Sequence, residues 1–368
     1  MPVLLAEPGT LGEAPGMRVL VTGATGFVGS WVARELVARG HEVRALIRPT
    51  SALANLEGLE LEQIQGDVTD LASVERALRG CQAVVHSAGA ASFRPGEEAR
   101  REAVNHAAVG VVLGAALRAG VRRAVLTSSV AAMGGTLEPA LMDEAWPTNA
   151  ESLGIDYFVS KLRGEREALR LAGEGLPVSA VRPGMVLGPG DVYDSSATLV
   201  LALARRRLPM VVRGGASFCD VRDVARGHAE ALERGRPGEV YILGGHNLEV
   251  ADMAARASRL AGVPAPRAVP SWVALATAGL SGLSRRLRGR KAGLSRQAIR
   301  ASRLYTFVSS EKARRELGYS IRPLEESLAD TLRWFMKAGR LKASTPELAM
   351  LAARETEDLP HGVGRADG

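Results

Sequence analysis

Three glycines at three-residue intervals follow an apolar run in Val19-Leu20-Val21-Thr22-Gly23-Ala24-Thr25-Gly26-Phe27-Val28-Gly29, and an amphipathic segment begins at once. This pattern predicts a strand, a tight turn and the start of a helix. Gly23 is expected to permit the turn, Gly26 to let the backbone approach a ligand closely, and Gly29 to let the helix pack against the strand. Free N–H groups at such a helix start can bind a pyrophosphate. The alternative is a glycine-rich turn that binds nothing.

The bulk composition is that of a globular protein. The chain has 368 residues, of which 46% are hydrophobic and 24% charged, so one large domain with a smaller one attached is expected. The formal net charge of +7 is compatible with an anionic partner, but we favour an arginine-rich solvated surface. Two distant cysteines, Cys81 and Cys219, do not have metal-ligand spacing, and we expect no metal. With no signal peptide and no long apolar run, we expect a cytoplasmic protein.

Strand and helix patterns alternate from residue 17 onward, which predicts an α/β fold with a doubly wound parallel Rossmann sheet. The expected strands are 18–21, 42–47, 59–65, 83–86, 124–127 and 178–181, with 240–243 returning to the sheet. The expected division is a flexible extension over 1–16, a dinucleotide-binding domain over 17–184 to which 216–245 returns, a smaller and mostly helical substrate lobe over 185–215 and 246–336, and a peripheral or disordered tail over 337–368.

The end of the second expected strand indicates the cofactor. A carboxylate there would hold the ribose hydroxyls of NAD, but the sequence runs Ile47-Arg48-Pro49. A guanidinium suits the 2′-phosphate of NADP through paired charge-assisted hydrogen bonds, so Arg48 favours NADP over NAD. The alternative is a surface arginine in a loop. Asp67 and Val68 follow the third strand, where an adenine would rest, although Asp67 is nearly as well explained as a helix cap.

Ser128-Ser129 ends the fifth expected strand, and Tyr157 and Lys161 lie four residues apart on one face of the next expected helix. A nearby ammonium is expected to lower the tyrosine pKa toward the range useful for proton transfer. A serine hydroxyl can hold a substrate oxygen, and Lys161 can bind the nicotinamide ribose. The alternative is an ordinary pair on a helix surface.

These motifs occur in a fixed order, which resembles that of an extended short-chain dehydrogenase/reductase of the NAD-dependent epimerase/dehydratase family. The resemblance covers residues 17–336, and its dihydroflavonol-4-reductase-like branch, which includes hopanoid-associated sugar epimerases, is the most similar. The motifs that carry it are Thr22–Gly29, Gly66-Asp67-Val68, Val84–Ala88, Val104-Asn105, Thr127-Ser128-Ser129, Tyr157-x-x-Ser160-Lys161, Arg182-Pro183-Gly184 and Asp220–Val224.

The resemblance implies a role for each matching residue. It implies that Tyr157 is the general acid/base, that Lys161 is its partner and a ribose ligand, and that Ser129 is the catalytic hydroxyl, with Ser128 as the alternative. Asn105 matches a structural or water-holding asparagine. The implied cofactor contacts are Gly23, Thr25, Gly26, Phe27, Val28, Arg48, Asp67, Val68, Ser87, Ala88, Lys161, Pro183, Gly184 and Met185.

The sequence also departs from parts of the family pattern. Val130-Ala131 replaces the Asp-Glu pair of the 4,6-dehydratases, which argues against that chemistry, and Met133-Gly134 replaces the Tyr-Gly common in epimerases. Asp220 or Asp223 is expected to cap a helix rather than to act in catalysis.

Substrate choice is expected to lie in the smaller lobe. Arg205, Arg206, Arg207 and Arg213 can meet an anionic substrate, but a solvated helix end explains them better. Residues 272–283 are apolar and 285–291 strongly basic, which fits either peripheral membrane contact or a core helix with a basic loop. Twelve apolar residues are too few to span a bilayer. The aromatic interleaving typical of single-strand nucleic-acid binding is missing, so no nucleic acid is expected.

The leading hypothesis is an oxidoreductase that transfers hydride between NADPH and a carbonyl or secondary alcohol, with Tyr157 moving the proton. The first alternative is a sugar-nucleotide epimerase with tightly held NAD, and the second is a non-catalytic NADP-binding scaffold. A homodimer formed through two long helices of the sheet is implied by the resemblance alone.

Overall fold

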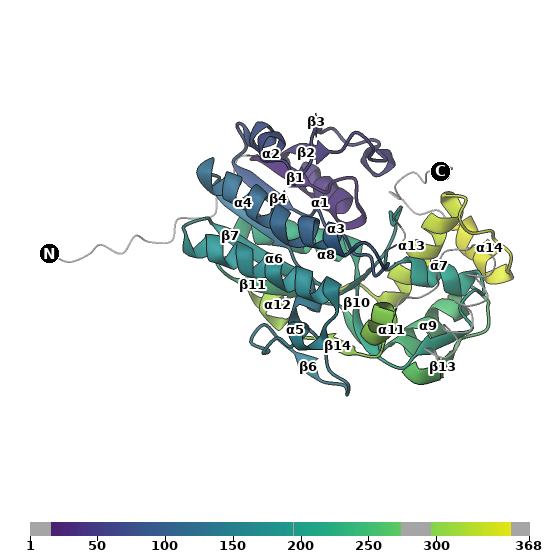
Figure 1. The fold of residues 1–368 in the computed structure, drawn as a ribbon. Helices are drawn as coiled ribbons and strands as arrows, with labels where there is room; N and C mark the ends of the chain where they lie inside the picture. The colour runs from purple at the N-terminus through teal and green to yellow at the C-terminus, as the bar shows by residue number, and fades with distance from the viewer. Residues whose placement is uncertain (1–15, 194, 274–295, 355–368) are drawn as a thin grey trace.

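The main sheet has seven parallel strands in the order β11-β7-β5-β4-β1-β2-β3 (Figure 1). The computed structural model describes residues 16–193, 195–273 and 296–354. This sheet confirms the predicted α/β class and includes the returning last strand. Its strands are β1 (Arg18–Thr22), β2 (Glu42–Ile47), β3 (Glu62–Gln65), β4 (Ala83–His86), β5 (Arg123–Thr127), β7 (Val178–Pro183) and β11 (Val240–Leu243).

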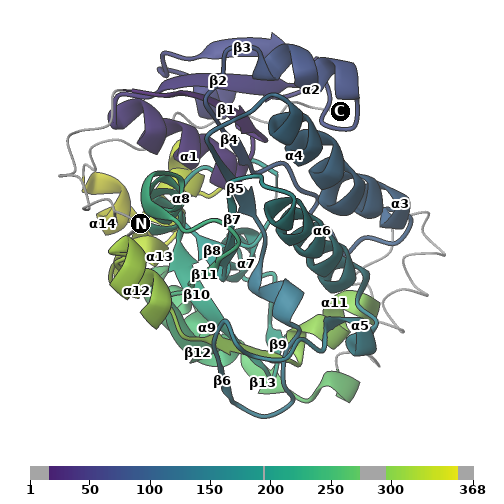
Figure 2. The ribbon, with the colours of Figure 1, turned by 90° about the vertical axis from the view of Figure 1, so that its left-hand side faces the viewer.

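Helices cover both faces of this sheet. Val19 and Val21 of β1 pack into the core that includes residues of α1 and α8, whereas Leu20 points into the core beneath α2, α4 and α6. Figure 2 shows α4 and α6 side by side on one face and α1 and α8 on the other. The helices around the sheet are α1 (Phe27–Ala38), α2 (Leu71–Leu78), α3 (Glu98–Glu102), α4 (Ala108–Arg118), α5 (Ala150–Leu153), α6 (Asp156–Gly173), α8 (Val221–Arg234) and α12 (Glu311–Leu317).

The turn between β1 and α1 depends on two glycines. Gly23 has φ +71°, and a Cβ there would lie 2.6 Å from the backbone nitrogen of Ala88. A Cβ on Gly29 would lie 2.2 Å from the Gly23 carbonyl oxygen. Gly23 therefore brings the turn against the loop after β4, and Gly29 brings α1 against the turn, as the sequence predicts.

The smaller lobe contains more strand than predicted. A second sheet runs in the order β12-β10-β14-β6, with β8 pairing to β10, and β9 pairs with β13. Four of these seven strands have only two or three residues, too few for an alternating pattern to show among the glycines and prolines of this region. They are β6 (Leu141–Met142), β8 (Met185–Leu187), β9 (Met210–Val212), β10 (Gly215–Asp220), β12 (His246–Glu249), β13 (Arg267–Val269) and β14 (Tyr305–Val308).

The chain returns to the main sheet with α8 at Val221 rather than at residue 216, because β10 belongs to the second sheet. Asp220 caps α8 by accepting a hydrogen bond from the Arg222 backbone nitrogen at 2.8 Å, as expected for a capping aspartate. The lobe helices are α7 (Thr198–Ala204), α9 (Val250–Leu260), α11 (Arg296–Ser302), α13 (Leu324–Lys337) and α14 (Pro346–Ala353).

The tail is not disordered over α14. Leu348 and Leu351 are buried, and the Thr345 hydroxyl donates a hydrogen bond to the Ala261 carbonyl oxygen at 2.7 Å. Residues 1–15 and 355–368 lie outside the described residues, as does 274–291 of the suggested membrane contact. Within the described ranges, no helix is both long and apolar enough to cross a membrane.

Gly29→Ala is expected to lower the free energy of unfolding by about 1–3 kcal/mol, because backbone atoms leave no room for the Cβ. Gly173→Ala is the matched control, because this exposed last residue of α6 has open space around it. Alanine there is expected to raise the free energy of unfolding by about 0.5–1 kcal/mol. Urea denaturation measures both, and equal effects of the two variants would contradict this account of the turn.

Candidate active site

Helix α6 and the end of β5 bring the predicted catalytic groups together. The Ser129 hydroxyl lies within hydrogen-bonding reach of the Tyr157 phenol and also accepts a hydrogen bond from the Ala131 backbone nitrogen at 3.1 Å. One turn further along α6, the Lys161 ammonium donates to the Thr127 carbonyl oxygen at 3.0 Å. Ser129, Tyr157 and Lys161 therefore form one cluster at the carboxyl edge of the sheet.

The net shift of the Tyr157 pKa is upward, opposite to the predicted one, and it is set by burial and Ser129 rather than by Lys161. Burial raises the pKa of Tyr157, and the hydrogen bond with Ser129 offsets this only in part. Burial also lowers the pKa of Lys161 to about 8, against the charge of Glu165, which raises it. Tyr157 is therefore held as the neutral phenol, the form that can donate a proton.

The two serines at the end of β5 have different partners. Ser128 is 4% exposed, and its hydroxyl donates to Glu165 Oε2 at 2.7 Å, on the side of the sheet beneath α6. Only Ser129 faces Tyr157. The sequence alone did not distinguish these two neighbours, because both are serines at the same strand end.

Asn105 lies in a π-helical turn, Ala103–Ala107, between α3 and α4. Its side-chain amide accepts from the Ala90 nitrogen at 2.8 Å, donates to the Ala90 oxygen at 3.0 Å and donates to the Ser160 hydroxyl at 3.0 Å. The π turn places this amide between the loop after β4 and helix α6, a use of π-helical turns that is common at functional sites. Asn105 therefore connects the loop after β4 to helix α6 and has a structural role in the active site.

The loop after β4 supplies an aromatic ring that sequence reasoning missed. Phe93 packs edge-on against Tyr157, with ring centroids 5.5 Å apart. The buried Arg101 guanidinium holds this loop by donating to the carbonyl oxygens of Ser92 at 2.9 Å and Arg94 at 3.2 Å. No periodic pattern marks a loop phenylalanine, so the sequence carried no usable signal for it.

The residues around the glycine turn fit a dinucleotide. No side chain caps α1, whose N-cap residue is Gly26. The Ser87 hydroxyl and His86 Nε2 are buried without a hydrogen-bond partner in the described structure. Thr22 Oγ1 accepts from the Ala88 nitrogen at 3.3 Å and lies 2.7 Å from His86 Nδ1. The uncapped helix start and the unpartnered hydroxyl are the features that a bound pyrophosphate and its ribose would use.

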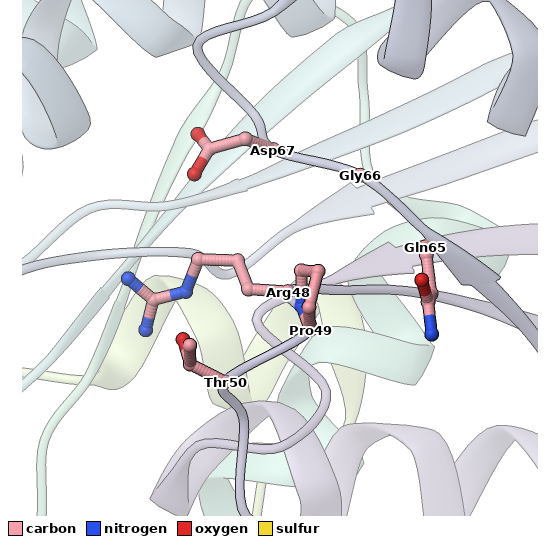
Figure 3. Close-up of a pocket in the computed structure, with 6 residues that line it drawn as sticks. All are labelled: Arg48, Pro49, Thr50, Gln65, Gly66 and Asp67. Carbon is pink, nitrogen blue, oxygen red and sulfur yellow. The ribbon is translucent and has the colours of Figure 1, made fainter.

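A hollow of about 390 Å³ lies at the ends of β2 and β3, lined by Arg48, Pro49, Thr50, Gln65, Gly66 and Asp67. Figure 3 shows Arg48, Thr50 and Asp67 extending to the same side of the hollow, while Gln65 lies apart from them. Asp67 is not the helix cap: it accepts from Thr69, and Asp70 caps α2. Although burial raises the pKa of Asp67, the Thr69 hydrogen bonds and the charge of Arg48 lower it overall.

The segment predicted to line the nicotinamide joins the two sheets. Pro183 ends β7 of the main sheet, and Met185 begins β8, which pairs with β10 of the second sheet. A Cβ on Gly184 would lie 2.3 Å from the Ser217 carbonyl oxygen, so this crossing is tightly packed. The segment leaves the sheet at β7, which lies next to β5 and two strands from β4, away from the glycine turn after β1.

The other predicted groups lie elsewhere. Arg205, Arg206 and Arg207 are exposed at the end of α7, and the Arg205 guanidinium donates to the Arg340 carbonyl oxygen, which agrees with a solvated helix end. Among the described residues, no group of three or more His, Cys, Asp or Glu side chains is placed to hold a metal ion.

A glycine-rich turn at a Rossmann sheet edge with a Tyr–Lys pair beside it defines an enzyme of the extended short-chain dehydrogenase/reductase type. Residues 19–244 match the model of the NAD dependent epimerase/dehydratase family, and the chain belongs to that family. The resemblance found in the sequence motifs is thereby confirmed.

Relatives of this chain include both reductases and epimerases. It is 34% identical over 329 residues to sterol demethylase protein B of Methylococcus capsulatus, covering 88% of this chain and 100% of that protein. It is 30% identical over 330 residues to 4-hydroxy-2-methyl-3-oxo-4-farnesyl-3,4-dihydroquinoline-1-oxide ketoreductase of Stigmatella aurantiaca, covering 88% of this chain and 98% of that protein.

Solved structures agree along the same length. The crystal structure of gox2253 has a TM-score of 0.78 at 38% identity, covering 89% of this chain and 99% of that one. PA4631, a nucleoside-diphosphate-sugar epimerase from Pseudomonas aeruginosa, has a TM-score of 0.73 at 31% identity over the same shares.

Asn105→Ala is expected to lower the free energy of unfolding by about 2 kcal/mol or more, because it leaves both polar groups of the Ala90 backbone without their partner. Hydrogen exchange at the Ala90 amide is expected to accelerate. Asn149→Ala is the matched control, since Asn149 makes the same paired hydrogen bonds to Gly135 in another loop. Unchanged protection at Ala90 in Asn105→Ala would contradict the structural role.

Proposed function

We propose that this protein is an NADPH-dependent reductase of a carbonyl compound, with Tyr157 as the proton donor. The observation that carries the proposal is the cluster of Tyr157, Ser129 and Lys161, in which burial raises the pKa of the Tyr157 phenol. A neutral phenol is the form required to protonate the oxygen of a carbonyl as it is reduced.

Each group of the cluster has one task. A bound nicotinamide supplies the hydride that reduces the carbonyl carbon. Ser129 holds the substrate oxygen by hydrogen bonding, next to the Tyr157 hydroxyl that it already contacts. The Tyr157 proton passes to that oxygen, which becomes the alcohol, and the phenolate left behind is stabilised by the Lys161 ammonium one helical turn away. Phe93 packs against the Tyr157 ring and restricts its position.

The cofactor preference follows from the hollow at the ends of β2 and β3. The hollow has Arg48 and the Thr50 hydroxyl on the side expected for the 2′-phosphate, and β2 ends without a carboxylate. Asp67 keeps its second carboxylate oxygen free of the Thr69 hydrogen bonds, which both use Oδ1, so it can accept from the adenine amino group. These groups support NADP over NAD.

The names of two relatives bear on the reaction. The ketoreductase of Stigmatella aurantiaca matches along nearly the full chain and supports carbonyl reduction. The second candidate, a sugar-nucleotide epimerase that keeps its cofactor, is favoured by the structural likeness to PA4631. The two differ in whether cofactor is consumed: a reductase oxidises one NADPH for each alcohol formed, and an epimerase consumes none.

Tyr157→Phe is expected to reduce kcat for NADPH-dependent carbonyl reduction by about 10²–10⁴-fold, because the phenol is the proton donor. Its Kd for NADPH is expected to stay within about threefold of the wild type. Tyr241→Phe is the control, since Tyr241 is a buried tyrosine on β11 whose hydroxyl accepts from the Arg236 nitrogen. Full activity of Tyr157→Phe against every carbonyl that the wild type reduces would refute the assignment.

Arg48→Ala is expected to weaken NADPH binding by about 10- to 100-fold while changing the Kd for NADH by less than about threefold, because only NADPH carries the 2′-phosphate. Cofactor fluorescence titration measures both constants. Arg118→Ala, which removes an exposed guanidinium on α4, controls for the change in net charge. Equal losses for both cofactors would exclude a 2′-phosphate site at Arg48.

A further inference from the structure

Glu165 is a buried carboxylate one helical turn beyond Lys161 on α6, and the chemistry proposed above does not use it. Its side chain is 3% exposed, and that of Arg182, its ion-pair partner on β7, is 10% exposed. Burying two charges costs desolvation energy, so such a pair contributes little net stability compared with apolar side chains of the same volume. Stability alone therefore does not explain a buried carboxylate at this position, and a role in the active site is the alternative.

The carboxylate joins the three segments that form the active site. Its Oε2 accepts from the Ser128 hydroxyl at 2.7 Å and from Arg182 Nε at 2.9 Å, and its Oε1 accepts from Arg182 Nη2 at 2.5 Å. Ser128 directly precedes Ser129, and Arg182 directly precedes Pro183 of the segment assigned to the nicotinamide. Figure 2 shows α6 running along the sheet beside β5 and β7. Glu165 is thus hydrogen-bonded to the residue before Ser129 and to the residue before Pro183, and it shares helix α6 with Tyr157.

We propose that Glu165 is a positioning residue of the proposed reductase: through Ser128 it holds Ser129 against Tyr157, and it is the counter-charge of Lys161, which lies four residues before it on the same helix. The inference rests on the proposed function for its role in reduction, whereas the charge of Lys161 can be measured without any substrate.

The charged and titratable groups around Lys161 support this assignment. On its own helix, Tyr157 lies four residues before Lys161 and Glu165 four residues after it. The charge of Lys161 also acts on His86 of β4 and His228 of α8, and the charge of Arg182 is paired to Glu165. Burial and the charge of Lys161 lower the pKa of His86 to about 3, and burial lowers that of His228 to about 4, so both histidines are neutral at pH 7. Burial lowers the pKa of Lys161, and the negative charge of Glu165 opposes this.

The test measures the titration of Lys161 directly. Lys161 is one of five lysines in the sequence, so its Nζ and Cε resonances can be followed by NMR in lysine-labelled full-length protein and assigned with Lys161→Arg. The wild-type midpoint is expected near pH 8. In Glu165→Gln the midpoint is expected about one pH unit lower, because a neutral amide no longer favours the ammonium. Glu165→Asp, which keeps the charge, is expected to restore most of the difference.

Two further variants keep the test decisive. Glu165→Gln with Arg182→Met removes the unpaired guanidinium that could prevent folding of the single variant. A lowered midpoint is again expected, by a smaller interval because the positive charge of Arg182 is lost as well. Glu167→Gln removes a carboxylate from the same helix that pairs instead with Arg170, and no shift is expected. A midpoint unchanged from the wild type in both Glu165→Gln proteins would overturn the proposal, whatever their stability.

Activity separates this proposal from the proposed function. With NADPH and the carbonyl reduced fastest by the wild type, the alkaline limb of kcat in Glu165→Gln is expected to move to lower pH by the same interval as the Lys161 midpoint. A shifted midpoint with an unshifted limb would overturn the role in reduction. If the wild type reduces none of the carbonyl compounds tested, the proposed reductase function is refuted. The NMR titration then still decides whether Glu165 sets the charge of Lys161.

Discussion

Two side chains of helix α6 are hydrogen-bonded to two successive residues at the carboxyl end of β5, Thr127 and Ser128, and the active site depends on this contact. Lys161 binds the Thr127 carbonyl oxygen, and Glu165 accepts the Ser128 hydroxyl. With both residues held to one helix, Ser129 emerges beside Tyr157 of that same helix. The contacts of Lys161 and Glu165 with the end of β5 therefore set where the Ser129 hydroxyl lies relative to the Tyr157 hydroxyl.

The other end of the site depends on a close backbone contact. Gly23 lets the first turn lie against Ala88, and this places the start of α1 next to the loop that carries Phe93. A dinucleotide along the sheet edge would extend from the hollow beside Arg48, past this turn, to the crossing at Gly184. The hollow beside Arg48 is lined mainly by polar and charged residues, whereas Tyr157 and Lys161 are partly buried between α6 and the sheet, and burial is the largest cause of their pKa shifts.

Features that follow from local chemistry could be predicted from sequence. The main sheet follows from apolar strands alternating with helices, the first turn from its glycines, and the Tyr157–Lys161 face from the helical period. The second sheet was missed because two of its strands have only two or three residues and its other strands do not alternate with helices in a regular order. Ser128 could not be separated from Ser129 because their partners come from distant segments. Burial, which reverses the expected shift of Tyr157, is a tertiary property. The same helical period could have placed Glu165 on the face of Tyr157 and Lys161, because it lies four residues after Lys161.

The most direct measurement of the central claim follows a deuterium label. Full-length protein is given NADPH carrying deuterium at the transferred position of C4, together with a panel of ketones and aldehydes, and cofactor and products are analysed by mass spectrometry. The account predicts an alcohol with one deuterium on the former carbonyl carbon and one oxidised cofactor for each alcohol. A stereochemically inverted sugar nucleotide formed without net cofactor oxidation, while no carbonyl is reduced, would contradict it.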